Sequence, residues 1–121
     1  LHVPAPNRRA DTLSGGNVQR MTFARAVLSH PTLLLASYPS RGLDVATVAA
    51  VHRTLFRLRD EGAAILLISE DLSELFEMAD SIMVLAAHTA SKPFDPSRCS
   101  VNDLGKHMLK GEGDNEASCA E

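Results

Sequence analysis

The feature that most constrains the fold is an alternation of short apolar runs and amphipathic stretches along the chain. Apolar runs occupy residues 32–37, 63–69 and 81–86, and each has the length of a strand that is buried on both faces. A helical apolar pattern separates the first run from the second, and a shorter one separates the second from the third. This order is typical of parallel strands that are covered by helices and joined by right-handed crossovers. The sequence therefore predicts an α/β fold.

Two longer helices are expected from their end signals. Ser14 is a good N-cap for a helix over about residues 14–29, and Asp44 can cap a second helix over residues 45–60. Gly62 stands at the position favoured just after a helix end. We expect the apolar residues at helical spacing to be core residues. They are Val18, Met21, Ala24 and Leu28 in the first helix and Val48, Val51, Leu55 and Leu58 in the second.

The C-terminal part should be less regular. Asp71 can cap a short helix, a short return strand is expected near Pro93–Phe94, and a last helix is expected over residues 101–110. Residues 111–121 are acidic and have little to bury, so we expect a disordered tail there. We therefore divide the chain into a portion of one domain, residues 1–110, and this tail.

The chain is expected to be a piece of a longer protein. Three strands are too few for an independent doubly wound domain, and the first residue is Leu1 and not Met. The missing strands would lie upstream of Leu1 or be supplied by a partner.

Composition argues against several classes of function. Outside the acidic tail the 12 basic residues are balanced by a similar number of acids, and no basic patch indicates a nucleic-acid partner. The longest apolar runs are far too short to cross a bilayer. The five His residues are scattered without metal-ligand spacing, so no metal site is expected.

The segment "SGG", Ser14 to Gly16, is the best candidate for an anion-binding site. Helix N-termini carry unpaired N–H groups and the positive end of the helix dipole. Glycines let a phosphate approach the backbone closely, and Ser14 adds a hydroxyl donor. An isolated "SGG" is more often a capping serine with two turn glycines, so the wider context has to decide.

That context is a family resemblance. "LSGGNVQR" resembles the signature motif of ABC transporter ATPases, in the form found in importers of simple sugars and nucleosides. The segments that match in order after it are "PTLLLASYPSRGLD" (Walker B strand and D-loop), "ILLISEDLSEL" (switch strand), "ADSIMVL" (the following strand) and "VNDLGKHMLKG" (closing helix). Together these motifs cover residues from about 11 to 111.

The resemblance implies a partial P-loop NTPase fold of the ABC ATPase type. The N-terminal half with its phosphate loop would be lacking, because no GxxxxGK[ST] motif occurs in the chain. In these importers two ATPase domains are fused in one chain, and the second is often degenerate. The chain resembles the C-terminal portion of that second domain.

The resemblance also implies cofactors, partners and a location. The intact importer would use ATP and Mg²⁺ held between opposite ATPase domains and would work with membrane permease subunits. It would lie on the cytoplasmic, inner face of the plasma membrane. The chain alone is expected to bind neither ATP nor Mg²⁺ and to be inactive as an enzyme.

The same resemblance gives roles to individual residues. Ser14, Gly15, Gly16 and Asn17 would face an ATP held by the opposite domain, together with the D-loop residue Asp44. Three catalytic positions depart from the family pattern. They are Ser37 and Tyr38, where an Asp and a Glu would stand, and Glu70, where a His would contact the γ-phosphate. A serine supplies no charge there, and a tyrosine with an ordinary pKa of about 10 is no base at neutral pH.

Plainer interpretations stay open beside these. Asp44 can be a helix cap, with or without a D-loop role. Tyr38 can be a half-buried aromatic at a strand end, and Glu70 a solvated loop residue.

Two alternatives of other classes also remain. The first is a non-functional or non-enzymatic truncated remnant of such a protein. The second is an ABC-type protein of DNA repair or chromosome maintenance, which Pro4 and Pro6, so close upstream of the signature, argue against.

Overall fold

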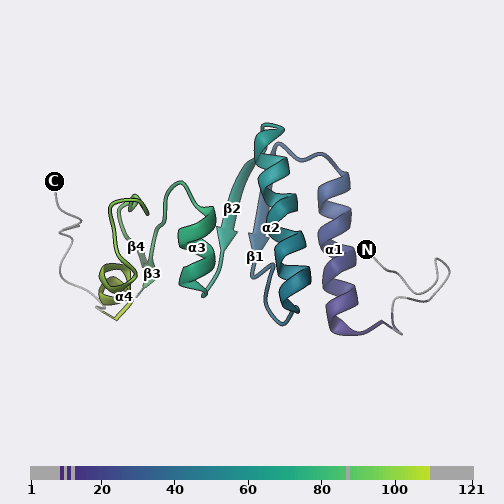
Figure 1. Cartoon of the computed structure of the whole chain (residues 1–121), viewed down its shortest axis with the longest axis horizontal. Helices are drawn as coiled ribbons and strands as arrows, with labels where there is room; N and C mark the ends of the chain where they lie inside the picture. The colour runs from purple at the N-terminus through teal and green to yellow at the C-terminus, as the bar shows by residue number, and fades with distance from the viewer. Residues whose placement is uncertain (1–8, 10, 12, 87, 110–121) are drawn as a thin grey trace. The chain divides into compact units, whose positions relative to one another are not determined.

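The computed structural model describes residues 9, 11, 13–86 and 88–109 of the 121-residue chain. After Ser69 the chain divides into two compact units, Leu1–Ser69 and Glu70–Glu121, and each is described by itself. The elements of the first unit are α1 (Gly15–Leu28), β1 (Leu33–Ser37), α2 (Val45–Asp60) and β2 (Ala64–Ile68) (Figure 1). Those of the second unit are α3 (Leu72–Met78), β3 (Leu85–Ala86), β4 (Thr89–Ala90) and α4 (Val101–Leu109) (Figure 1).

β1 and β2 form a parallel pair. The register runs from Leu33 opposite Ala64 to Ser37 opposite Ile68. α2 makes the connection between the two strands, because a tight turn cannot join parallel neighbours (Figure 1). The predicted strand–helix–strand order and parallel pairing are therefore confirmed for this unit.

α2 begins and ends where the sequence predicts. Asp44 Oδ1 accepts a hydrogen bond from the N–H of Thr47 at 3.0 Å. At the other end Gly62 has φ 96°, a left-handed conformation that glycine adopts without a Cβ clash. The N–H of Ala63 then donates to the carbonyl oxygen of Leu58 at 3.0 Å and closes the helix. The buried residues of α2 are Val51, Leu55 and Leu58, three of the four predicted.

The sheet buries only one of its apolar faces. Along β1, Leu34 and Ala36 are 7% and 6% exposed, whereas Leu33 and Leu35 are 66% and 60% exposed. Leu66 pairs with Leu35 in the register and is 53% exposed. The prediction of a strand buried on both faces is therefore wrong for β1 in the described structure. Side chains alternate along a strand, and a face stays exposed unless a second layer covers it.

α1 is confirmed as a helix, but its predicted apolar face is wrong. The exposed residues of that predicted face are Val18, Met21 and Leu28, at 44%, 44% and 76%. The buried residue of α1 is Val27, and Gln19, Arg20 and Phe23 on the same side are half-buried. The difference arises because Gln19 and Arg20 make hydrogen bonds to neighbouring segments, which turns this side of the helix inward.

The second unit has an apolar core of its own. Its buried residues are Ile82, Val84, Phe94, Cys99 and Leu104, and the residues of α3 and its end that pack against them are Leu72, Leu75, Phe76 and Ala79. Asp71 caps α3, accepting from the N–H of Ser73 at 2.9 Å. α4 confirms the predicted last helix over its described residues, and the predicted tail, residues 111–121, lies outside the described part.

The third predicted strand is wrong as a parallel strand. Ile82 and Phe94 form an antiparallel bridge with N–H···O bonds of 3.0 and 2.7 Å, and β3 pairs antiparallel with β4. An antiparallel pair can be closed by a short turn, so this segment satisfies its backbone groups without a crossover. The return predicted near Pro93–Phe94 is present as this isolated bridge at Phe94 and not as a strand.

The described residues include no helix that combines the length and the apolar character of a membrane span.

Candidate functional site

The predicted anion-facing segment lies at the start of α1. Ser14 is the N-cap, with φ −64° and ψ 154°, and its side chain makes no capping hydrogen bond. Its carbonyl oxygen accepts from the N–H groups of Asn17 and Val18 at 2.9 and 3.0 Å. Ser14 and Gly15 are exposed, and no acidic residue stands in the first turn. The positive end of the helix dipole is therefore not offset by a carboxylate of that turn.

Gly15 and Gly16 make no side-chain-excluding contact with the described residues outside their own helix turn. A Cβ atom added at either position would meet none of those residues within 4 Å. Glycine inside a helix destabilises it by roughly 0.5–1 kcal/mol relative to alanine. The described part of the chain thus gives no steric reason for the two glycines in the first turn of α1. The open surface that they leave suits the close approach of an external group such as a phosphate.

Ser37 and Tyr38 lie at the carboxyl end of β1. The N–H of Tyr38 donates to the carbonyl oxygen of Ile68 at 2.8 Å. Tyr38 has φ 49°, a left-handed conformation that is unfavourable for a bulky side chain. Its ring lies beneath the Arg41 guanidinium, with 5.7 Å from the guanidinium carbon to the ring centroid. Neither side chain offers a carboxylate for a metal ion or for a water molecule.

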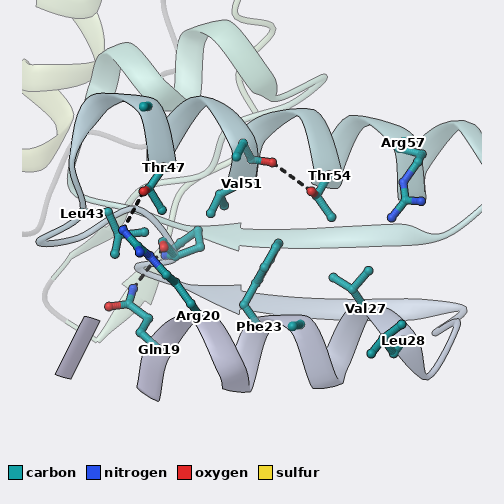
Figure 2. Close-up of a pocket in the computed structure, with 14 residues that line it drawn as sticks. Gln19, Arg20, Phe23, Val27, Leu28, Leu43, Thr47, Val51, Thr54 and Arg57 are labelled. Atoms are coloured by element: carbon teal, nitrogen blue, oxygen red, sulfur yellow. Dashed lines mark hydrogen bonds between the residues drawn. The ribbon is translucent and has the colours of Figure 1, made fainter. Parts of the chain in front are cut away.

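Asp44 is both a helix cap and part of a polar cluster. In addition to the capping bond, Asp44 Oδ2 accepts from Thr47 Oγ1 at 2.6 Å. Arg20 Nη2 on α1 donates to the same Oδ2 at 2.9 Å. It also donates to Thr47 Oγ1 at 2.7 Å (Figure 2). The capping interpretation of Asp44 is therefore confirmed. The cluster also ties the second turn of α1 to the first turn of α2.

The hydrogen bonds lower the pKa of Asp44 below its ordinary value. The Thr47 hydroxyl is the largest cause, followed by the Thr47 backbone N–H, and the Arg20 charge acts in the same direction. Asp44 is therefore an anion at neutral pH, as both the capping bond and the ion pair with Arg20 require.

Gln19 makes a second link from α1. Its side-chain nitrogen donates to the carbonyl oxygens of Tyr38 and Pro39 at 3.2 and 3.0 Å. α1 is thus bonded to the loop that follows β1 as well as to α2. Gln19 and Arg20 were not predicted as site residues. The signal available in the sequence was their position at the end of the motif "LSGGNVQR", one residue after its "SGGN".

Beyond these polar links, a groove of about 470 Å³ lies between α1 and α2. Phe23 and Val27 from α1 and Val51 and Thr54 from α2 point into it (Figure 2). The facing sides of the two helices therefore do not close fully on each other.

The structure brings most of the predicted site residues into one unit. The start of α1, the end of β1 and Asp44 all belong to the first unit, and Gln19 and Arg20 connect them. Glu70 is exposed and belongs to the second unit. Within the described part of the chain, no group of three or more His, Cys, Asp or Glu side chains could hold a metal ion.

Comparison with known proteins gives a consistent set of relatives. No protein-family model matches the chain. It is 38% identical over 102 residues to the nucleoside import ATP-binding protein NupA of Lactococcus lactis, an alignment that covers 84% of the chain and 20% of NupA. It is 34% identical over 120 residues to the guanosine import ATP-binding protein NupO of Bacillus subtilis, with 99% and 23% covered.

A third relative belongs to sugar transport. The ribose import ATP-binding protein RbsA 1 of Streptomyces coelicolor is 46% identical over 74 residues, with 61% of the chain and 15% of that protein covered. The chain spans about a fifth of the length of the curated relatives it matches. The chain is therefore a homologue of the ATP-binding proteins of ABC sugar and nucleoside importers and corresponds to a part of them.

Proposed function

We propose that the chain is the signature-bearing, C-terminal portion of the second, degenerate ATPase domain of an ABC importer for simple sugars or nucleosides. Its function is to present Ser14, Gly15, Gly16 and Asn17, together with the D-loop residue Asp44, to an ATP held by the opposite ATPase domain. The relatives, which are named as import ATP-binding proteins for nucleosides and ribose, support the importer class.

The observation that carries the proposal is the open start of α1. Two glycines with room for a Cβ among the described residues stand in a first turn without an acid, after a serine whose side chain makes no capping bond. These residues fit a phosphate group, which bonds to backbone N–H groups at a helix N-terminus. Preorganised donors of this kind stabilise the charge that develops on a transferring phosphoryl group.

The chain supplies no complete nucleotide site of its own in this proposal. The sequence has no phosphate loop, and Ser37 and Tyr38 replace the two acids that the family pattern expects. ATP and Mg²⁺ would therefore be held by the opposite domain and would supply the reacting phosphate and its counter-charge. The degenerate positions Ser37, Tyr38 and Glu70 would take no part in the chemistry.

The partners and the location follow from the importer class. The ATPase domain would work with membrane permease subunits at the inner face of the plasma membrane, on the cytoplasmic side. No nucleic acid is involved. The solute would be selected by other subunits of the importer.

The test is a charge placed at the start of α1 in the assembled importer. Gly15→Asp puts a carboxylate where a phosphate would approach, and we expect ATP hydrolysis to be abolished. The helix itself should tolerate the change, because an added Cβ has room among the described residues and an acid suits a helix N-terminus. Ser14→Ala should have a smaller effect, since the backbone donors remain.

The matched control is Thr22→Asp, which adds the same charge to an exposed position further along α1. Its ATPase rate should stay close to that of the unmodified importer. An unaffected Gly15→Asp importer would overturn the proposal and would favour the alternative of a remnant without a role in hydrolysis.

A further inference from the structure

Gln19 and Arg20 stand on the inward side of α1, one turn after the start of the helix. Arg20 bonds to Asp44 and Thr47 at the start of α2, and Gln19 bonds to the carbonyl oxygens of Tyr38 and Pro39 after β1. These two side chains therefore connect α1 to two separate segments of the first unit. We refer to Gln19 and Arg20, with these bonds, as the α1 latch.

We infer that the α1 latch positions the signature segment, and that Arg20 in particular is a positioning residue for ATP hydrolysis by the opposite domain. This inference rests on the proposed function. Arg20 acts through α1 and need not touch the nucleotide itself. It would set the direction in which the first turn of α1 points, relative to Asp44 and the end of β1.

The packing of α1 explains why a polar latch is needed. The groove of about 470 Å³ between α1 and α2 leaves Phe23 half-buried and without full contact across the helix pair. Val27 is the buried residue of the helix, and it lies near the C-terminal end. Apolar packing thus holds that end better than the start, which is the part proposed to face the phosphate.

The geometry of Arg20 suits a positioning role. One guanidinium nitrogen bonds to a carboxylate oxygen at 2.9 Å and to a hydroxyl oxygen at 2.7 Å, and that hydroxyl also bonds to the same carboxylate oxygen at 2.6 Å. Three bonds that share atoms restrict the rotation of α1 about its axis more than a single ion pair would. A planar guanidinium meets such a fixed set of acceptors, whereas a lysine offers a flexible point charge.

The first measurement uses the 121-residue chain and tests whether the latch exists. Arg20→Met should shift the amide NMR resonances of Thr47 and Val48 on α2. Asp44→Asn keeps an acceptor for the capping bond and loses the charge. The shifts of the Arg20→Met/Asp44→Asn double variant should be smaller than the sum of the single shifts, since both changes break one cluster. Additive shifts would show that the two residues do not interact.

The second measurement tests the role in the assembled importer. Arg20→Met should lower kcat for ATP hydrolysis by about tenfold or more, because small misplacements of a catalytic group are costly. KM for ATP should change by less than about twofold, since the opposite domain holds the nucleotide. Arg20→Lys should restore part of kcat. Arg25→Met, at an exposed position of the same helix, should leave kcat unchanged.

The outcomes separate the two proposals. If Gly15→Asp abolishes hydrolysis and Arg20→Met leaves kcat unchanged, or lowers it only together with the melting temperature, the positioning role is overturned and the proposed function stands. If Gly15→Asp has no effect, the proposed function fails and the positioning role fails with it. A loss of kcat in both variants, at unchanged KM and unchanged melting temperature, supports both.

Discussion

The backbone N–H of Tyr38 donates to the carbonyl oxygen of Ile68 at 2.8 Å, which extends the pairing of β1 and β2 one residue beyond the end of β1. Tyr38 makes this bond from a left-handed conformation, with φ 49°. The end of the strand is therefore fixed by the sheet, at a backbone angle that suits glycine better than tyrosine.

Replacing Tyr38 should show this backbone strain directly. Tyr38→Gly and Tyr38→Ala both remove the ring and its contact with Arg41. The glycine variant should be the more stable of the two by about 1–2 kcal/mol, because an L-residue with a Cβ is strained in the left-handed region. Urea unfolding of the two variants would measure the difference. Equal stability would mean that Tyr38 is not held at this angle.

Restoring the missing acids should not create an ATPase. Ser37→Asp combined with Tyr38→Glu supplies two carboxylates at the end of β1, but the sequence still has no phosphate loop. We expect no phosphate release by the double variant of the chain. Steady turnover of ATP by this variant would contradict our account of what the chain lacks.

The exposed apolar face of the sheet should cause self-association. Leu33, Leu35 and Leu66 are more than half exposed, and large apolar patches of this kind mark contact surfaces. Leu35→Lys should reduce oligomer formation by the chain in light scattering. Met83→Lys, at an exposed position of the other unit, serves as the control and should not. An identical particle size for all three chains would exclude this face as the cause.

The lowered pKa of Asp44 predicts that the chain loses part of its folding stability in acid. The hydroxyl of Thr47 holds the pKa of Asp44 below its ordinary value of 3.8. A carboxyl with a lowered pKa in the folded state stabilises the fold above the ordinary pKa, and this contribution is lost as pH falls through the lowered value. Asp44→Asn should therefore melt below the unmodified chain at neutral pH. The two should converge as the pH falls through the lowered pKa of Asp44, and an equal gap at every pH would contradict the prediction.

The buried side of α2 should dominate the stability of the first unit. Leu55 is 1% exposed, so Leu55→Ala should destabilise that unit by roughly 2–5 kcal/mol through lost contacts and a cavity. Leu33→Ala removes the same atoms from a side chain that is 66% exposed. It should cost less than about 0.5 kcal/mol, as is usual for surface positions. Chemical unfolding of the two variants would test the difference.

The parts of the fold that could be predicted are those with local signals. α2 has a capping aspartate, an apolar stripe and a terminal glycine, and its bounds agree with the sequence pattern. The third apolar run has the composition of a buried parallel strand, but its pairing is set by Phe94, which lies well outside the run. A strand's partner depends on tertiary contacts that its own residues do not encode.

Only part of the candidate site could be predicted from the sequence. The start of α1 follows from the motif and its glycines. Gln19 and Arg20 could not be assigned from the pattern, because polar residues on a helix ordinarily face solvent and their acceptors lie on other segments. An apolar stripe through Val18 and Met21 was the more obvious inward face, and it is exposed.

The two kinds of strand pairing in the chain imply an order of folding. Leu85 and Ala90 pair across a short turn, so little chain entropy is lost when β3 meets β4, and hairpins of this kind form in about 1–10 μs. Leu33 and Ala64 pair only after the whole of α2 has brought β2 back beside β1. Closing this longer loop costs chain entropy before β1 and β2 gain any contacts with each other. The pairing of β1 with β2 is therefore the slower step. During refolding, amide protons of the hairpin should therefore become protected before those of the parallel ladder.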